Sequence, residues 1–206
     1  MSSKRQSLAP PAPKPPTTLH ASLCIAENAS LIGTKRITIG ANTVIHPRSK
    51  LNSTYGPITI GNYCIVSERC QIGLQADSEE HDQAEGLTIG DGVVVEVGAV
   101  VEAKRIGDGC VIEINTRIGK GAVLGKVCLV HFPVLESGSD AMSQHCKIGP
   151  LCTVADGEIL PDFTVLYGHN SRRVDRSGAE EQKMKMVMRQ VEILRKLIPS
   201  NVAKFQ

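Results

Sequence analysis

The stretch IGDGCVIEINTRIGKGAVLGKVCLV, residues 106–130, carries an aliphatic residue at every sixth position. The repeating residues are Ile106, Ile112, Ile118, Leu124 and Val130. A period of six fits neither an amphipathic helix nor one long strand, but it fits a solenoid of short strands that turn at regular corners. The stretch therefore predicts an all-β solenoid.

The same aliphatic position extends through most of the chain. Upstream and downstream it collects Leu19, Ile25, Leu31, Ile39, Ile45, Leu51, Ile60, Val66, Ile72, Ile89, Val95, Val101, Ile148, Val154, Leu160 and Leu166. Three hexads make one triangular coil, so the series predicts about seven coils, with interruptions at 33–38, 52–59, 74–88 and 131–147. Each coil would bury its aliphatic side chains against those of its neighbours.

Glycine often follows the aliphatic residue. The eight examples are Gly40, Gly61, Gly73, Gly90, Gly107, Gly119, Gly125 and Gly149. A tight corner often requires a positive φ, which glycine adopts without penalty. We therefore predict that these glycines have left-handed backbone conformations.

Six of the seven cysteines share one position, two residues before an aliphatic member of the series. They are Cys64, Cys70, Cys110, Cys128, Cys146 and Cys152. Elsewhere this position holds small residues such as alanine, serine and threonine, and a free cysteine packs as a small hydrophobe. No CxxC pair of the kind that zinc ribbons use is present. We expect core thiols with no disulfide, no zinc and no other cofactor; Glu158 breaks the small-residue rule.

Composition limits the range of functions. The 206 residues carry 23 basic and 21 acidic side chains, scattered along the chain, for a net charge of +2, which gives no argument for nucleic-acid binding. No apolar run approaches the roughly 20 residues that span a bilayer, and no apolar signal region opens the sequence. We expect a cytoplasmic protein without direct membrane insertion.

The two ends of the chain depart from the hexad pattern. Residues 1–18 include a proline-rich start with little to bury, and are predicted to form a disordered tail. The β-helix is predicted over 19–168, a connector over 169–178 and an amphipathic helix over 179–198. Ser177-Gly178-Ala179-Glu180 has the form of a capping box, and Pro199 ends the helical pattern.

The last coil predicts a contact with another element. Val154, Leu160 and Leu166 remain aliphatic to the end of the series, and the unpaired backbone groups of a terminal strand are normally covered. Either the chain's own helix or a partner subunit could cover them. Our hypothesis for the partner-binding residues names Tyr167, Arg172, Arg173, Val187, Val191 and Leu194.

Hexads of this form resemble those of the left-handed parallel β-helix, or hexapeptide-repeat, superfamily. That superfamily includes trimeric acyltransferases, γ-class carbonic anhydrases and non-catalytic scaffolds, and the fold alone does not choose among them. A carbonic anhydrase needs three converging imidazoles, but His46 and His131 lie four coils apart, or roughly 19 Å, and His145 is in another segment. We expect these three histidines to be solvated corner residues. An acyltransferase needs a general base, and His81 in the acidic segment 75–86 is a candidate.

A closer resemblance rests on short sequence segments that are not explained by the hexad. They are Thr43-Val44-Ile45-His46-Pro47, Gly56-Pro57-Ile58-Thr59-Ile60-Gly61, Glu96-Val97-Gly98, Ile106-Gly107-Asp108, Val111-Ile112-Glu113, Val165-Leu166-Tyr167-Gly168, Arg172-Arg173-Val174 and Leu194-Arg195-Lys196-Leu197-Ile198-Pro199-Ser200-Asn201. In this order they resemble the dynactin subunit 6 family, from the first coils to the last helix.

The resemblance implies a non-enzymatic subunit of the pointed-end complex of dynactin, the activator of cytoplasmic dynein. The implied partners are a second β-helical subunit, an actin-related capping protein and a zinc-containing scaffold subunit, with dynein and cargo as indirect partners. The implied location is the cytoplasm and cytoskeleton. The alternative is a trimeric hexapeptide-repeat acyltransferase or a γ-carbonic anhydrase-like enzyme.

Overall fold

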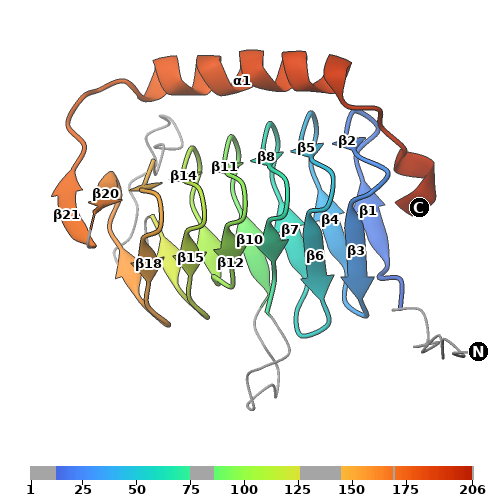
Figure 1. The fold of residues 1–206 in the computed structure, drawn as a ribbon, viewed down its shortest axis with the longest axis horizontal. Helices are drawn as coiled ribbons and strands as arrows, with labels where there is room; N and C mark the ends of the chain where they lie inside the picture. Colours follow the sequence, from blue (N-terminus) through green and yellow to red (C-terminus); the bar gives the residue numbers. More distant parts are fainter. Residues whose placement is uncertain (1–12, 75–85, 126–144, 169, 206) are drawn as a thin grey trace, which may run out of the picture.

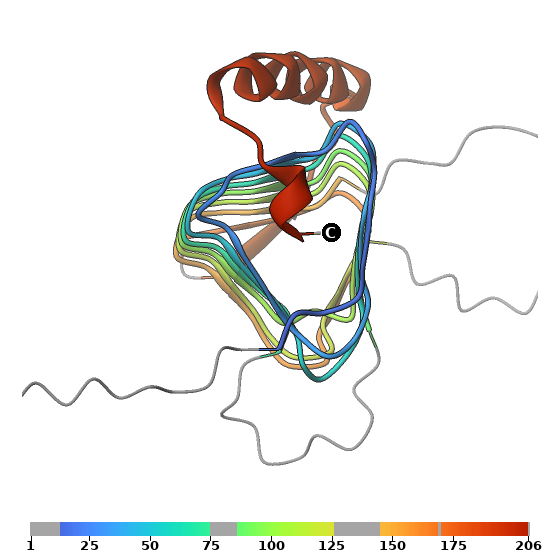
Figure 2. The same ribbon diagram turned by 90° about the vertical axis from the view of Figure 1, so that its right-hand side faces the viewer.

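A computed structural model of the chain describes residues 13–74, 86–125, 145–168 and 170–205. In this part of the chain, short strands stack into three sheets that enclose a triangular prism, seen from the side in Figure 1 and along its axis in Figure 2. One helix lies along one side of the prism. The predicted left-handed parallel β-helix of about seven coils with a C-terminal helix is confirmed.

Each coil contributes one strand to each sheet until the last coil, which lacks the third. Sheet A contains β1 (Thr17–Leu19), β4 (Ile37–Ile39), β7 (Ile58–Ile60), β10 (Leu87–Ile89), β13 (Arg105–Ile106), β16 (Val123–Leu124) and β19 (Ile159–Leu160). Sheet B contains β2 (Cys24–Ile25), β5 (Val44–Ile45), β8 (Ile65–Val66), β11 (Val94–Val95), β14 (Val111–Ile112), β17 (Lys147–Ile148), β20 (Thr164–Tyr167) and β21 (Ser171–Val174). Sheet C contains β3 (Ser30–Gly33), β6 (Lys50–Ser53), β9 (Gln71–Ile72), β12 (Val100–Val101), β15 (Arg117–Ile118) and β18 (Thr153–Val154). After the strands come α1 (Glu180–Leu197) and a 3-10 turn, η1 (Val202–Phe205).

The aliphatic series forms the core. Its described members are 8% exposed or less, apart from the partly buried Leu19, and they pair in register from coil to coil, as Ile60 does with Ile39 and Ile89. Val130 lies outside the described residues. Ile112 pairs with Ile148, so the ladder position after Ile112 belongs to Ile148, eighteen residues further along the chain than the period predicts.

The interruptions of the hexad lie at corners. Those at 33–38, 52–59 and 74–88 each separate a strand of sheet C from the next strand of sheet A, so they extend the same edge of the prism. Residues 75–85 of the third lie outside the described residues. The remaining interruption separates β16 of sheet A from β17 of sheet B.

The explanation offered for the glycine after the aliphatic residue is wrong at most positions. Gly73 and Gly125 have a positive φ, of 97° and 87°, but the other six of the eight glycines do not. At Gly61 the reason is close approach, because a Cβ there would lie 2.6 Å from the carbonyl oxygen of Gly90 in the next coil. The left-handed residue of the corner comes two positions later, as at Tyr63, whose φ is 53°.

The predicted burial of the cysteines at small core positions is confirmed for the described residues. Cys64, Cys70, Cys110, Cys146 and Cys152 are free thiols and 1% exposed or less; Cys128 lies outside the described residues. Burial raises the pKa of Cys64 to about 12 and that of Cys70 to about 11, so both thiols stay protonated at neutral pH. Protonated, buried thiols fill the core as small hydrophobes.

The predicted disordered tail, residues 1–18, overlaps the first coil. Residues 1–12 lie outside the described residues, but Thr17 and Thr18 already belong to β1. The carbonyl oxygens of Pro13 and Pro16 accept hydrogen bonds from the backbone N–H groups of Gly33 and Ile37, at 3.1 and 3.0 Å. Proline can take this role because these positions only accept hydrogen bonds.

Ile112→Asp should lower the free energy of unfolding by more than about 3 kcal/mol, because it buries an unpaired carboxylate between coils. Ile114→Asp is the matched control, since Ile114 lies two residues further along the same segment and is 46% exposed, whereas Ile112 is 0% exposed. Urea unfolding of the two variants and the wild type measures the difference. Equal losses in the two variants would contradict the register.

Candidate interaction surface

Sheet B differs from the other two sheets in its outward-facing residues. The residue before the core aliphatic is Val44 in β5, Ile65 in β8 and Val94 in β11, whereas sheet A carries threonine at this place in its first four strands. These outward apolar side chains are themselves buried, at 0%, 1% and 7% exposure. Sheet B therefore has two apolar faces, and its outer face requires a cover. The contrast between these apolar residues and the threonines of sheet A is visible in the sequence and could have predicted the covered face.

Helix α1 supplies that cover. Val191 is 1% exposed and packs in one cluster with Cys24, Val44, Ile65 and Val94, while Val187 and Leu194 pack against the same cluster. Figure 1 shows the helix running back along the strands of sheet B toward the first coil. Three residues of the hypothesised partner surface, Val187, Val191 and Leu194, thus face the chain's own sheet, and their assignment to a partner is corrected. The seventh cysteine, Cys24, belongs to this contact.

The helix starts later than predicted. Its N-cap is Ala179, which provides no side-chain hydrogen bond, so the capping box predicted from Ser177 is wrong. The backbone N–H of Ser177 instead donates to Oδ1 of Asp175 at 3.1 Å, and the ammonium of Lys183 lies 2.7 Å from Oδ2 of the same carboxylate. Lys183 and these hydrogen bonds hold the pKa of Asp175 well below its ordinary value. Asp175 thus ties the first turn of the helix to the connector.

The segment after α1 covers the first coil. Ser200 forms an antiparallel bridge with Ala26, its Oγ accepts from the N–H of Ile25 at 3.1 Å, and the N–H of Asn201 donates to the carbonyl of Ile25 at 2.9 Å. Phe205 packs against the main core, and its carbonyl accepts from Oγ1 of Thr17 at 2.7 Å. The C-terminal segment therefore closes the N-terminal end of the prism (Figure 2).

At the opposite end, the predicted connector covers the edge of sheet B. Residues Ser171–Val174 form β21, which reverses direction and pairs antiparallel with β20. Arg172 forms an ion pair with Glu158, and the other carboxylate oxygen of Glu158 accepts from the N–H of Ala155 at 2.9 Å. Glu158 breaks the small-residue rule because it holds this cap. Arg172 therefore has a partner within the chain, while Arg173 and Tyr167 are exposed.

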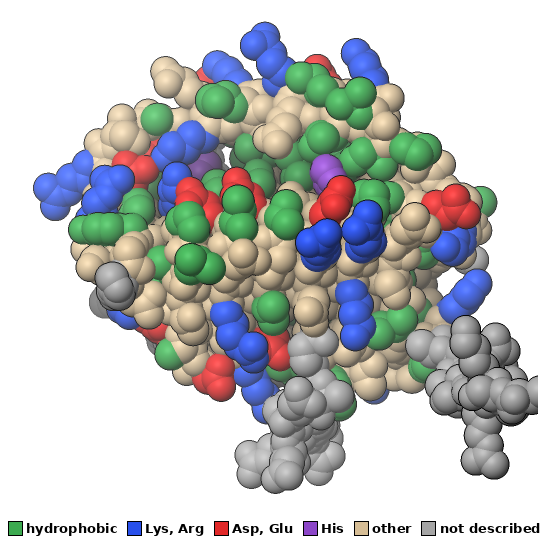
Figure 3. Space-filling view, viewed as in Figure 1, with side chains coloured by type: hydrophobic (Ala, Val, Ile, Leu, Met, Phe, Trp, Pro, Cys, Tyr) green, Lys and Arg blue, Asp and Glu red, His purple; other side chains and the backbone are tan. Residues whose placement is uncertain are grey.

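An apolar ridge follows the corner between sheets B and C. Val97, Ile114 and Leu151 come from successive coils and are 41%, 46% and 76% exposed. The N–H of Asn115 donates to the carbonyl of Val97, and that of Leu151 to the carbonyl of Ile114, so the three residues lie on neighbouring rungs. Figure 3 shows hydrophobic side chains exposed on one face of the molecule. We call Val97, Ile114 and Leu151 the corner ridge.

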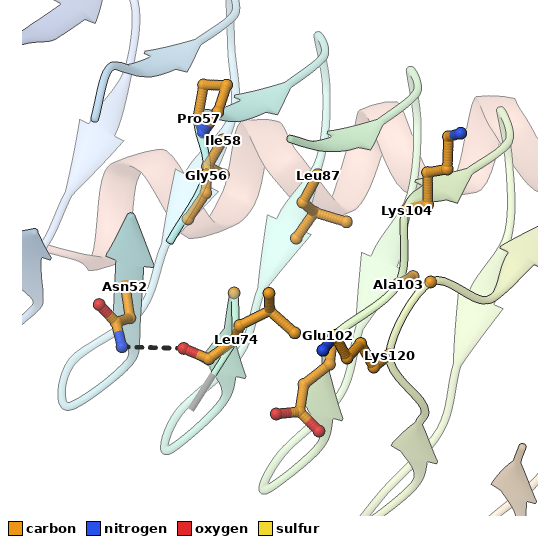
Figure 4. Close-up of a pocket in the computed structure, with 12 residues that line it drawn as sticks. Asn52, Gly56, Pro57, Ile58, Leu74, Leu87, Glu102, Ala103, Lys104 and Lys120 are labelled. Carbon is orange, nitrogen blue, oxygen red and sulfur yellow. Dashed lines mark hydrogen bonds between the residues drawn. The ribbon is translucent and has the colours of Figure 1, made fainter. Parts of the chain in front are cut away.

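A hollow of about 190 Å³ opens at the corner between sheets C and A (Figure 4). Its walls include Leu74, Leu87, Glu102, Lys104 and Lys120, and a hydrogen bond of 2.9 Å from Nδ2 of Asn52 to the carbonyl of Leu74 crosses one side. Residues 75–85, with the candidate base His81, lie between Leu74 and Leu87 and outside the described residues. Among the described residues, no histidine lines this hollow.

Two of the three histidines considered as zinc ligands are described, and neither is a solvated corner residue. His46 is half-buried, and His145 is 6% exposed, with its Nδ1 at 3.1 Å from the carbonyl oxygen of Gly109 and its ring stacked on Phe163. Burial lowers the pKa of both imidazoles. His131 lies outside the described residues, within which no group of three metal-ligating side chains occurs. Within the described residues, no helix is both long and apolar enough to cross a membrane.

The chain is similar in sequence to three curated proteins named dynactin subunit 6. It is 30% identical to the protein of Nematostella vectensis over 181 residues, which cover 85% of each chain. It is 29% identical to the proteins of Danio rerio and Xenopus tropicalis over 171 residues, which cover 80% of this chain and 75% and 73% of theirs. No protein-family model matches the chain.

Solved structures with a similar fold are more distant in sequence. A hexapeptide transferase family protein from Anaplasma phagocytophilum superposes with a TM-score of 0.52 at 14% identity, over 88% of this chain and 90% of that one. A putative acetyltransferase from Bacillus cereus gives a TM-score of 0.54 at 16% identity, over 88% and 92%. At these identities the likeness concerns the fold alone.

Arg172→Glu should destabilise the cap on the last coil by about 1 kcal/mol, because it places a second carboxylate beside Glu158 in a half-exposed pair. Arg173→Glu is the control: the neighbouring side chain is exposed and forms no ion pair with the described residues. Urea unfolding and amide exchange of β20 and β21 would report the difference. A larger loss in the Arg173 variant would count against the role given to Glu158.

Deleting residues 200–206 should uncover the first coil and lower the free energy of unfolding by about 2 kcal/mol, through the lost burial of Val202 and Phe205. Amide exchange should accelerate in residues 17–31. Residues 159–167, at the other end, serve as the internal control and should keep their protection. Equal acceleration at both ends, or none, would show that this segment is not the cap of the first coil.

Proposed function

The chain belongs to the dynactin subunit 6 family, and we propose on this premise that it is a non-catalytic structural subunit of dynactin. The observation that carries the proposal is the collinear match, 30% identity over 85% of both chains. A match of this length extends well beyond the hexad pattern of a few coils. The acyltransferase-like structures share the fold at 14% and 16% identity. Similarity of fold at this level gives no reason to assign their activity to this chain.

The contacts that the buried histidine and cysteine side chains make within the chain support a structural role. His145 stacks on Phe163 and bonds to the backbone, and the thiols of Cys64 and Cys70 stay protonated in the core. These side chains hold coils together. In the same way, α1, β21 and the segment after Pro199 cover surfaces that a stack of coils leaves open.

In the proposed role the chain is part of the pointed-end complex. Its partners there would be the second β-helical subunit, the actin-related capping protein and the zinc-containing scaffold subunit. The assembly would support dynein-dependent transport and cargo attachment in the cytoplasm, on the cytoskeleton. The family membership supports this placement, and no catalytic step is part of it.

The proposed contact with these partners uses exposed apolar side chains near the last coil. Tyr167 is 46% exposed and Leu151 is 76% exposed, and the corner ridge continues from Leu151 to Ile114 and Val97. Arg173 adds an exposed charge on β21. This surface keeps Tyr167 and Arg173 from the original hypothesis, and adds the ridge in place of the inward face of the helix.

Affinity purification of the tagged full chain from its own cells, followed by mass spectrometry, tests the assignment. Recovery of dynactin and actin-related subunits is the expected result. A homotrimer without these companions, together with acyl transfer or CO2 hydration by the purified protein, would contradict it and favour the enzyme.

Leu151→Asn tests the surface with little risk to the fold. Leu151 has a φ of 58°, a conformation that asparagine tolerates better than leucine, so stability should be kept or improved. Recovery of partner subunits should fall severalfold. Arg48→Asn is the matched control, because Arg48 is exposed and has a φ of 60° at the equivalent corner of the second coil. Undiminished recovery with the Leu151 variant would place the interface elsewhere.

A further inference from the structure

Helix α1 carries a second apolar stripe on one flank, about a quarter turn around the helix from the residues that pack on sheet B. Met186, Ile193 and Leu197 are 72%, 52% and 70% exposed, whereas Val191 on the inner side is 1% exposed. With Gln190 they are spaced by four, three and four residues, which is the spacing of alternating d and a positions in a heptad. We call Met186, Gln190, Ile193 and Leu197 the outer seam.

Basic residues border the outer seam on one side. Arg189 and Lys196 precede Gln190 and Leu197 by one residue, the g position of the same heptads. Both are exposed, and neither forms an ion pair or hydrogen bond with the described residues. Their basic neighbours differ, because Lys185 pairs with Glu181 at 2.7 Å and Arg195 donates to Asn42 at 2.8 Å. Figure 3 shows basic side chains projecting from the helix beside hydrophobic ones.

We propose that the outer seam docks an amphipathic helix of a partner protein whose apolar stripe is flanked by acidic residues. The side chains Met186, Ile193 and Leu197 supply the apolar contact, and Arg189 and Lys196 select carboxylates on the flank of the incoming helix. The inner face of α1 is already fixed on sheet B, so docking does not require α1 to fold first. The seam is shorter than two full heptads, which fits a reversible contact.

A second copy of this chain fits the seam poorly. Two copies that pair antiparallel about a twofold axis bring g positions opposite g positions. Arg189 and Lys196 would then face their own counterparts, and like charges at these positions repel. The charge pattern therefore favours a partner with acidic flanks over an antiparallel second copy.

A membrane surface also fits less well than a helix. Interfacial helices use a broad apolar face, often with aromatic residues, against the lipid. Here the broad face is packed on sheet B, and the outer seam is a single stripe interrupted by Gln190 and without an aromatic side chain. The geometry thus matches a partner helix.

The probe is a synthetic peptide of three heptads with leucine and isoleucine at a and d and glutamate at e and g, added to the purified full chain. Its own glutamates oppose self-pairing at pH 7. Fluorescence anisotropy should give binding at least tenfold tighter than for the same peptide with lysine at e and g, and the affinity should fall as salt rises. Binding of both peptides with equal affinity would overturn the proposed charge selection.

Arg189→Glu with Lys196→Glu should weaken binding of the acidic peptide at least tenfold, and Ile193→Asp should do the same through the apolar contact. The control is Arg105→Glu with Lys50→Glu, an equal change of charge on sheets A and C, which should leave binding unchanged. An equal loss of peptide affinity in the control variant would show that net charge alone, and not the position of Arg189 and Lys196, determines binding. Circular dichroism confirms that each variant keeps its fold.

Two further measurements can overturn the choice of partner. Flotation with phosphatidylserine vesicles, lost in the Arg189 and Lys196 variant, would make the seam a membrane contact. A dimer that forms on concentration and is abolished by Ile193→Asp would make it a self-interface. The inference concerns the isolated chain and does not rest on the proposed place in dynactin, so failure of the peptide test leaves the co-purification result intact, and the reverse holds too.

Discussion

Backbone pairing between coils is the constraint on which the rest of the molecule depends. Parallel strands of neighbouring coils pair residue for residue, so every position of a coil lies directly above its equivalent in the next. A side chain must therefore be compatible with a copy of its own position about 4.8 Å away. Aliphatic residues satisfy this in the core. At the corner after sheet A, Gly61 lies on Gly90, and the carboxylate of Asp91 accepts from the N–H of Asn62 at 2.7 Å. Thus the same rule that stacks the core also fixes the corner residues.

A ladder of this kind stabilises every coil except the two at its ends. The chain solves the two ends differently. At the last coil it reverses at once, and β21 adds an antiparallel strand that Arg172 and Glu158 hold. At the first coil the chain returns along sheet B as α1 and lays Ser200 and Phe205 on the opening strands. The helix is therefore both the cover of sheet B and the connection that brings the second cap into place.

The parts of this structure that the sequence predicted are those with a local signal. Burial imposes the period of six directly, so the register of Ile112 and the packing of Cys110 could be derived without knowing any contact. The caps depend on residues that are far apart in the sequence, such as Thr17 and Phe205. A periodic pattern cannot predict such a contact. The prediction for the glycines was wrong because two different constraints both select glycine. One is a positive φ, and the other is the close approach of the neighbouring coil, which the sequence of one coil does not reveal. The helix face was different. Val44, Ile65 and Val94 precede core residues where sheet A has threonine, and this contrast would have shown that Val191 faces inward.

Which residues remain for a partner follows from what the fold already uses. Covering the outer face of sheet B takes Val187, Val191 and Leu194, and closing the last coil takes Arg172. A residue whose chemistry suits a partner interface can therefore be excluded from that interface when it already packs against another surface of the same chain. Among the described residues, the large apolar side chains left exposed include the corner ridge near the last coil and the outer seam of α1. The helix lies on sheet B with Arg195 at the corner between sheets A and B, so its outer seam is on the flank toward the corner between sheets B and C, where the ridge lies. A stack of coils that uses its own segments to cover its ends thus presents its remaining apolar surface along its side.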